Sequence, residues 1–155
     1  MANVTIKKRG FTLLEILITV GLVTIVGSVA SFIEINSFRG DAFRSEVSTI
    51  GTALQTARAN SFNNINQKIH GVAFNPGGSK TYVIFEGNTF ATRDTSKDVV
   101  LKSSYDLEFS PLSPTEVTFS QLSGDASYNG DITLLDTTRG MSAEININYE
   151  GKIAW

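Results

Sequence analysis

Few residues of this sequence have the types and spacing that catalysis requires. The 155 residues include no cysteine and one histidine, His70. Without cysteine there is no thiol nucleophile, no disulfide and no cysteine-based zinc site. Serine, aspartate and glutamate are frequent, but a lone histidine leaves no motif that pairs a nucleophile with a base. The sequence therefore predicts a protein that is not an enzyme and that has no cofactor and no metal site.

One loop holds oxygen ligands of the kind that calcium prefers. Asp125, Asn129 and Asp131 lie close together around Gly130. Their spacing does not follow the EF-hand pattern, and an Asn-Gly pair is typical of a turn. A solvated turn is the preferred interpretation, and calcium binding by a loop stays open.

Glu15 is the one charged residue of an apolar segment. This segment, Phe11 to Ile33, has 23 residues. As a helix it would rise about 35 Å, enough to cross the roughly 30 Å hydrocarbon core of a bilayer. A charge at that depth costs several kcal/mol unless it is paired or lies near the interface. Pairing with another polypeptide would relieve this cost, and so would snorkelling toward the headgroups in a monomer.

The charges that flank residues 11–33 predict the orientation of the segment. The basic run Lys7–Arg9 precedes it, whereas Glu34, Arg39 and Asp41 follow it. The positive-inside rule places the N-terminus in the cytoplasm and the residues after the segment outside. A secretory signal peptide fits less well, because its apolar core is usually only about 7–15 residues long. A plain signal anchor also explains the cations and the apolar run.

A second helical pattern follows without a break. One apolar stripe with a 4-3-4-3 spacing comprises Phe43, Val47, Ile50, Leu54 and Ala57. Several asparagines then predict an end near Asn60–Asn66, because asparagine is a poor helix former. We therefore expect an amphipathic helix within residues 34–66, continuous with the apolar segment.

Residues 67–155 are predicted to form a β-rich headpiece. Short runs rich in β-branched and aromatic residues are separated by turn sequences. The expected strands are 71–74, 81–85, 99–101, 116–119, 131–135 and 144–149. An amphipathic helix and a one-sided sheet can bury each other's apolar faces. The predicted fold class is α+β: a long N-terminal helix, membrane-spanning and then amphipathic, packed on a small antiparallel β-sheet headpiece.

The charge balance argues against nucleic acid as a partner. From Glu34 onward, ten basic residues stand against fourteen acidic ones. Affinity for nucleic acid comes largely from cations that release phosphate counterions. The cations of the headpiece are scattered along the sequence: Lys68, Lys80, Arg93, Lys97, Lys102, Arg139 and Lys152. Trp155 could stack on a base, but we prefer a tryptophan that covers a sheet edge.

The N-terminal residues resemble a known processing signal. Lys7-Lys-Arg-Gly10, followed by Phe11-Thr-Leu-Leu-Glu15 and an apolar helix, is similar to the class III leader of type IV pilins and type II secretion pseudopilins. The resemblance implies that a membrane-embedded prepilin peptidase removes the leader 1–10 by cutting between Gly10 and Phe11 and then methylates Phe11. It also implies that Glu15 pairs with the freed Phe11 amine of a neighbouring subunit during assembly.

Looser motifs in the rest of the chain resemble one subgroup. Leu54-Gln-Thr-Ala-Arg58, Gly71-Val-Ala-Phe74 with Tyr82-Val-Ile-Phe85, and Ile145-x-Ile147-x-x-x-Gly151-Lys-Ile153 are similar to the GspH/FimT group of minor pseudopilins and minor pilins. The resemblance implies a structural subunit that is anchored in the bacterial inner membrane by a single pass, with its headpiece outside the cytoplasm. The subunit then enters a pilus or pseudopilus. The implied partners are the prepilin peptidase, other pilin or pseudopilin subunits and the inner-membrane assembly platform.

Two other functions remain possible at this point. One is a DNA-uptake minor pilin, whose relatives use basic residues near the closing strand, where this chain has only Lys152 beside Glu150. The other is a permanently membrane-anchored module whose β domain binds a ligand. The chain also has Phe32 where many pilins carry a helix-kinking proline, so no inference is drawn from that proline.

Overall fold

The structure is a computed structural model that describes residues 11–78, 80–103, 107–110 and 112–155, with the backbone alone for residues 29–39. The predicted leader 1–10, including Gly10, lies outside the described residues. The chain divides into two units, one ending at Asp41 and the other running from Ala42 to Trp155.

The helix α1 begins at Leu13 and ends at Phe62, inside the interval predicted for its end. In the first unit, the large apolar side chains from Phe11 to Val26 are between 54% and 79% exposed. The helix surface at Gly21 and Gly27 is also open, because a Cβ atom added at either glycine would have no neighbouring atom within 4 Å. Within the described parts of the chain, no helix is both long enough and apolar enough to cross a membrane. The transmembrane helix predicted at 11–33 is therefore not confirmed.

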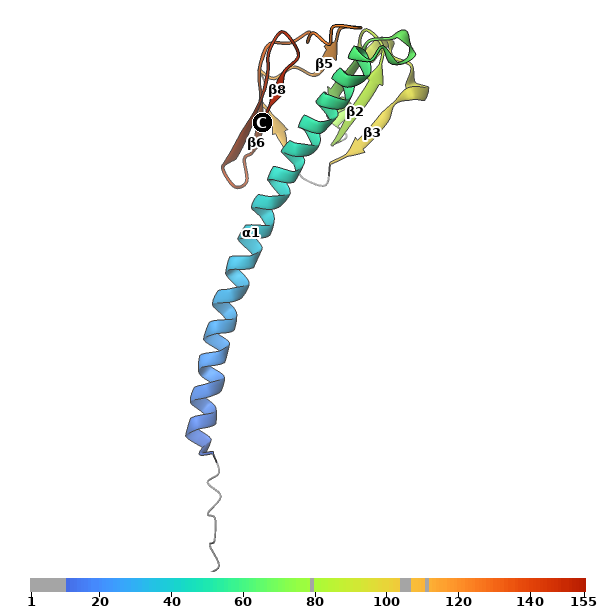
Figure 1. Cartoon of the computed structure of the whole chain (residues 1–155). Coiled ribbons are helices and arrows are strands. Elements are labelled where there is room, and N and C mark those ends of the chain that lie inside the picture. Colours follow the sequence, from blue (N-terminus) through green and yellow to red (C-terminus); the bar gives the residue numbers. More distant parts are fainter. Residues whose placement is uncertain (1–10, 79, 104–106, 111) are drawn as a thin grey trace, which may run out of the picture. The chain divides into compact units, whose positions relative to one another are not determined.

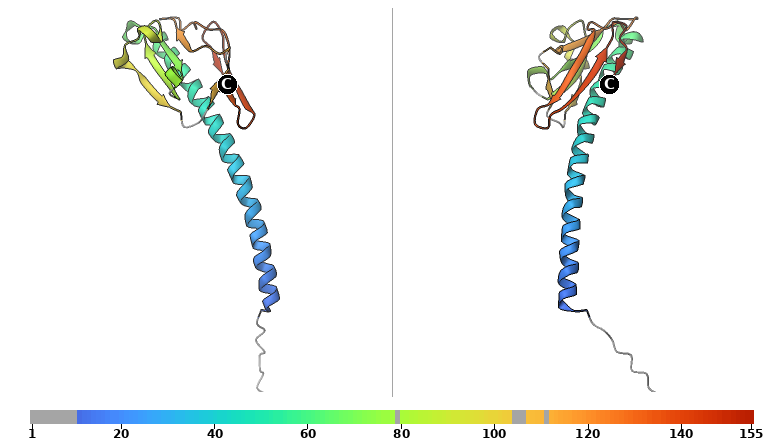
Figure 2. Two further views of the ribbon diagram at one scale, coloured as in Figure 1. Left: turned by 180° about the vertical axis from the view of Figure 1, so that it is seen from behind. Right: turned by 90° about the vertical axis from the view of Figure 1, so that its left-hand side faces the viewer.

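Two antiparallel sheets accompany α1 in the second unit. The first, in the order β3-β2-β1-β5, contains β1 (His70–Phe74), β2 (Thr81–Glu86), β3 (Val99–Lys102) and β5 (Glu116–Phe119). The second, in the order β4-β6-β7-β8, contains β4 (Glu108–Phe109), β6 (Gly130–Asp136), β7 (Met141–Ile147) and β8 (Ile153–Ala154). Short 3-10 helices lie at Ile65–Gln67, Pro76–Gly78, Phe90–Thr92 and Thr95–Lys97. The two sheets lie on either side of the end of α1 (Figures 1 and 2).

The predicted apolar stripe of α1 forms the centre of the core. Its five residues are at most 7% exposed, and Ile50, Leu54 and Ala57 are completely buried. Both sheets contribute to the same cluster. The first sheet supplies Val72, Phe74, Tyr82, Ile84, Val117 and Phe119, and the second supplies Ile132, Leu134, Ile145 and Ile147. The α+β class, with a helix packed on antiparallel sheets, is confirmed.

The prediction of one small sheet was wrong, since there are two. The strands β4 and β8 have two residues each, too few for any periodicity to show. The β6–β7 hairpin turns between Asp136 and Met141, and Gly130, which was predicted to lie in a turn with Asn129 before the strand 131–135, is itself the first residue of β6. Asp136 closes this hairpin, because its Oδ1 accepts a hydrogen bond from the Arg139 N–H at 3.1 Å and its Oδ2 one from the guanidinium at 2.7 Å.

Replacing the buried Leu54 should therefore destabilise the second unit strongly. In a fragment beginning at Phe38, Leu54→Ala should lower the free energy of unfolding by about 2–5 kcal/mol, because it leaves a cavity in the shared core. The neighbouring Gln55→Ala, at an exposed position, should change it by less than about 0.5 kcal/mol. Urea denaturation followed by circular dichroism measures both. Equal stability of the two variants would contradict the packing of this stripe.

Candidate functional site

The first turn of α1 is capped by Thr12. Its carbonyl oxygen accepts hydrogen bonds from the N–H groups of Glu15 at 3.1 Å and Ile16 at 3.2 Å. Its Oγ1 also accepts from the Glu15 N–H, at 3.3 Å. Thr12 is thus the N-cap and Glu15 the third helical residue; they occupy the positions of a Thr-x-x-Glu capping box, of which the structure shows the hydrogen bond to Thr12 Oγ1. A negative charge in the first turn is also favoured by the helix dipole.

The two sequence-predicted site residues in this region lie one helical turn apart and face solvent. Phe11 is 79% exposed and precedes the helix. The Glu15 side chain is also exposed, and its carboxylate forms no ion pair with any described residue. Both groups are therefore accessible to another molecule. The role of Thr12 was missed in the sequence, although Thr-x-x-Glu before an apolar run is a recognisable capping signal.

The hydroxyl groups after this turn bind back to the helix. Thr19 Oγ1 donates to the carbonyl oxygen of Glu15 at 2.9 Å. Thr24 Oγ1 donates to that of Val20 at 2.6 Å, and Ser28 Oγ to that of Ile25 at 2.8 Å. These hydroxyls need no outside partner. Residues 11–28 consequently present an apolar surface with one carboxylate, a surface that favours lipid or other apolar polypeptide over water.

His70 lies in a buried polar cluster of the second unit. It is 5% exposed, and its backbone N–H donates to Ser61 Oγ at 2.8 Å. Its Nε2 is 3.8 Å from Glu86 Oε2, which accepts a hydrogen bond from Asn66 Nδ2 at 2.7 Å. Burial lowers the pKa of His70, and the charge of Glu86 opposes this effect in part. The cluster joins the end of α1 to β1 and β2.

A second buried carboxylate lies beside Tyr82. Glu46 is 6% exposed, and its Oε1 has no hydrogen-bond partner. Burial raises the pKa of Tyr82, a hydrogen bond with Ser103 opposes this, and the charge of Glu46 raises the pKa further. Tyr82 therefore stays protonated at any physiological pH.

In the loop with calcium-type ligands, the carboxylate of Asp131 is used within the protein. Asp131 Oδ1 accepts a hydrogen bond from Asn146 Nδ2 at 2.6 Å, across the β6–β7 pair. The backbone carbonyl of Asp131 accepts from the Tyr128 hydroxyl at 3.1 Å. Over the described residues, no three His, Cys, Asp or Glu side chains gather so that they could hold a metal ion.

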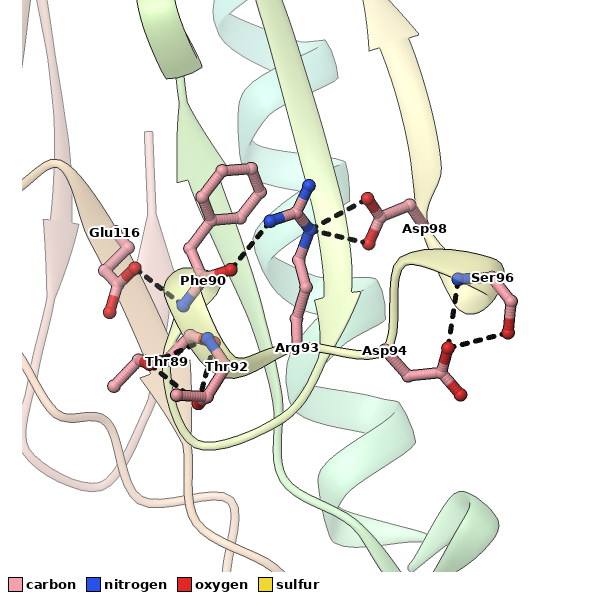
Figure 3. A network of polar contacts seen from close by, with 8 residues as sticks. All are labelled: Thr89, Phe90, Thr92, Arg93, Asp94, Ser96, Asp98 and Glu116. Atoms are coloured by element: carbon pink, nitrogen blue, oxygen red, sulfur yellow. Dashed lines mark hydrogen bonds and ion pairs between the residues drawn. The ribbon is translucent and has the colours of Figure 1, made fainter.

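Two arginines of the second unit, Arg58 and Arg93, are engaged by protein oxygens, whereas Arg44 is exposed. Arg58 donates to the carbonyl oxygens of Gly124 at 3.3 Å and Glu150 at 3.1 Å. Arg93 pairs with Asp98 at 2.8 Å and lies over the ring of Phe90 (Figure 3). The exposed cations of this unit are consequently mainly lysines, which lie on different strands and loops.

Trp155 follows the edge strand β8 and packs on α1. A Cβ atom added at Gly51 would lie 2.6–2.7 Å from three carbon atoms of the Trp155 ring. Only glycine leaves room for the ring at this place. The tryptophan is 48% exposed, so one part of the ring stays in solvent.

The comparison with known families gives one match. Residues 6–31 match the model described as the prokaryotic N-terminal methylation motif. No curated protein and no solved structure matches the chain. The motif is a type IV pilin-like prepilin signal and supports the pilin and pseudopilin superfamily, with processing by a prepilin peptidase and assembly with other pilin subunits. It covers the N-terminal region alone, so the GspH/FimT group is not confirmed.

The buried histidine should make the stability of the second unit depend on pH. Because the pKa of His70 is lower in the folded state, the unfolded chain binds more protons just below its ordinary pKa of about 6.5. The free energy of unfolding should therefore fall as the pH decreases from 7.5 to 5. It should fall less for His70→Gln, which cannot be protonated. Urea denaturation at both pH values tests this, and equal losses in the two proteins would exclude His70 as the cause.

Proposed function

We propose that this protein is a structural subunit, a minor pseudopilin or minor pilin of the GspH/FimT kind, of a type II secretion pseudopilus or type IV pilus. The observation that carries the proposal is the N-terminal methylation motif over residues 6–31. The exposed apolar side chains of residues 11–28 support it, because no described residue of their own unit covers them. The role is structural and needs neither catalysis nor a cofactor.

Maturation removes the leader by a defined reaction. Hydrolysis of the Gly10–Phe11 peptide bond consumes one water and leaves a carboxylate on Gly10 and an amine on Phe11. A methyl group then passes from a sulfonium-type methyl donor to that amine, the nitrogen loses a proton, and the donor leaves as a thioether. The absence of a side chain on Gly10 supports cleavage there, because a protease can draw the backbone close to its catalytic groups.

Before assembly the subunit is a single-pass protein of the bacterial inner membrane. Residues 11–33 hold it in the bilayer, with the leader in the cytoplasm and the headpiece outside. The length of the apolar segment and the cations Lys7–Arg9 on its N-terminal side support this arrangement. Its partners are the prepilin peptidase, the inner-membrane assembly platform and other subunits. The excess of acidic residues in the headpiece disfavours nucleic acid as a further partner.

Glu15 directs assembly in this proposal. A carboxylate in apolar surroundings is costly unless it is paired, and Glu15 has no ion-pair partner among the described residues. Cleavage creates a cation at Phe11, one helical turn away. In a filament, the Phe11 amine of one subunit can meet Glu15 of the next, so that subunits associate only after cleavage.

Cleavage is tested by co-expression with a prepilin peptidase. The chain should lose ten residues, and mass spectrometry should find a methylated Phe11 at the N-terminus. A Gly10→Val variant should keep Met1, because the added side chain hinders the approach of the protease. A parent chain that keeps Met1 in the presence of an active peptidase would support the permanently anchored module instead.

The charge of Glu15 is tested separately from its place in the capping box. Glu15→Gln retains a side chain that caps at this position but has no charge, whereas Glu15→Ala loses both. Both variants should be cleaved normally, and both should be missing from sheared filaments, as detected by immunoblotting. If Glu15→Gln enters filaments at the level of the parent while Glu15→Ala does not, capping rather than ion pairing explains the residue.

A further inference from the structure

The strand β3 differs from the other strands at the edges of the two sheets. The edge β5 is covered, since its Thr118 exchanges hydrogen bonds with Ser127 at 3.0 and 2.9 Å. The edges β4 and β8 have only two residues each. In contrast, β3 has four residues and, among the described strands, pairs only with β2; it lies at the outer side of its sheet (Figures 1 and 2).

The hydrogen-bond register shows which backbone groups of β3 face outward. Ser103 N–H donates to the Lys80 carbonyl oxygen at 2.9 Å. Because antiparallel pairs alternate, the backbone groups of Leu101 and Val99 then bond to β2. The N–H and C=O groups of Val100 and Lys102 therefore point away from the sheet, and no hydrogen bond to them is found among the described residues. They can accept a further strand.

The side chains of β3 extend the apolar face of the sheet beyond β2. Val99 lies opposite Ile84 and Leu101 opposite Tyr82, so both side chains are on the face that packs on α1. Val99 and Val100 are each 52% exposed, one on either face of the sheet. Such an edge usually pairs with another chain or is covered.

A groove runs between this edge and α1. It has a volume of about 350 Å³ and is lined by Ile84 and Leu101 on the sheet and by Ser45, Ser48, Thr49, Thr52, Ala53 and Thr56 on the helix. The hydroxyls of Thr49, Thr52 and Thr56 donate to carbonyl oxygens of α1 four residues earlier, at 2.8–2.9 Å. Their methyl groups are thus left to line the groove. The space equals roughly a dozen water molecules, enough for aliphatic side chains.

Each end of β3 carries an exposed lysine, and at the first end the charge of the exposed Asp94 also interacts with that of Lys97. Lys97 precedes the strand and Lys102 ends it, and both are exposed. The acidic residue between them, Asp98, accepts hydrogen bonds from Arg93 Nε at 2.8 and 3.0 Å (Figure 3). This pair neutralises Asp98 and also holds the loop that leads into β3. A partner with carboxylates at both ends of its bound segment would complement this edge.

We propose that β3 and the groove beside it bind an extended, acid-flanked segment of another polypeptide by strand addition. The backbone of the segment bonds to Val100 and Lys102, its alternate aliphatic side chains enter the groove, and its carboxylates lie near Lys97 and Lys102. Backbone hydrogen bonds give affinity and the groove gives specificity, as in other cases of strand addition. The site needs neither cleavage of the leader nor filament assembly, so it stands or falls separately from the proposed function.

A model peptide tests the site on the full-length protein in detergent micelles. The probe is a fluorescein-labelled, end-blocked peptide Glu-Thr-Val-Thr-Val-Thr-Glu, followed by fluorescence anisotropy, with empty micelles as background. It should bind saturably. A peptide that is N-methylated at alternate residues, and one with lysines in place of both glutamates, should each bind at least tenfold more weakly. Absence of binding by the parent peptide, or equal binding by the N-methylated one, would overturn the proposal.

Two variants localise the binding. Val100→Pro removes an N–H that points away from β2, a position where an edge strand tolerates proline, and Thr52→Arg fills the groove from the helix. Each should weaken binding at least tenfold with an unchanged circular dichroism spectrum, whereas Gln55→Arg, at an exposed place on α1 outside the groove, should not.

Unchanged binding by both correctly folded variants would place the peptide elsewhere and reject the site. The oligomeric state of the parent protein is measured by sedimentation in the same detergent. If the parent protein is a dimer and Val100→Pro dissociates it, a second copy of this chain occupies the edge. That result would overturn the proposal that an acid-flanked segment of another polypeptide is the partner.

Discussion

The second unit depends on the burial of one helical stripe between two sheets. Strand pairing is confined to each sheet, so the apolar surface around Ile50, Leu54 and Ala57 is what both sheets share. At about 25 cal/mol per Å² of apolar surface removed from water, this burial is the main favourable term available to join them. The groove beside β3 and the cluster at His70 keep their shape because the same helix forms one wall of each.

The two parts of α1 differ in how their apolar side chains are arranged around the helix. After Ala42 the apolar residues follow one stripe, and the stripe is buried within its own unit. Up to Ser28 apolar residues surround the helix on all sides, and their side chains are exposed. A helix that is apolar all round needs lipid or other helices around it. In the proposed subunit, the first part therefore forms associations while the second part keeps the headpiece folded.

Periodicity predicted those features that depend on residues close in sequence. The stripe from Phe43 to Ala57 and the end of α1 at Phe62 follow from local spacing and from the asparagines beyond it. The hydrogen bond from the Glu15 N–H to Thr12 could also have been predicted from the sequence Thr-x-x-Glu, but this signal was missed. The cluster of His70 and Glu86 could not be predicted, since tertiary contact alone brings them together. The edge position of β3 could not be predicted either, because the order of strands in a sheet is not determined by the sequence of a four-residue strand.

The inward-facing hydroxyls of Thr19, Thr24 and Ser28 have a thermodynamic consequence. Each already donates to a carbonyl oxygen of its own helix, so its hydrogen bonds are the same in hydrocarbon, in a protein interior and in detergent. When this segment exchanges one of these surroundings for another, the enthalpy change arises mainly from dispersion contacts of the apolar side chains, because these hydroxyls lose no hydrogen bond. Calorimetry of such a transfer would thus report on the packing of the apolar side chains.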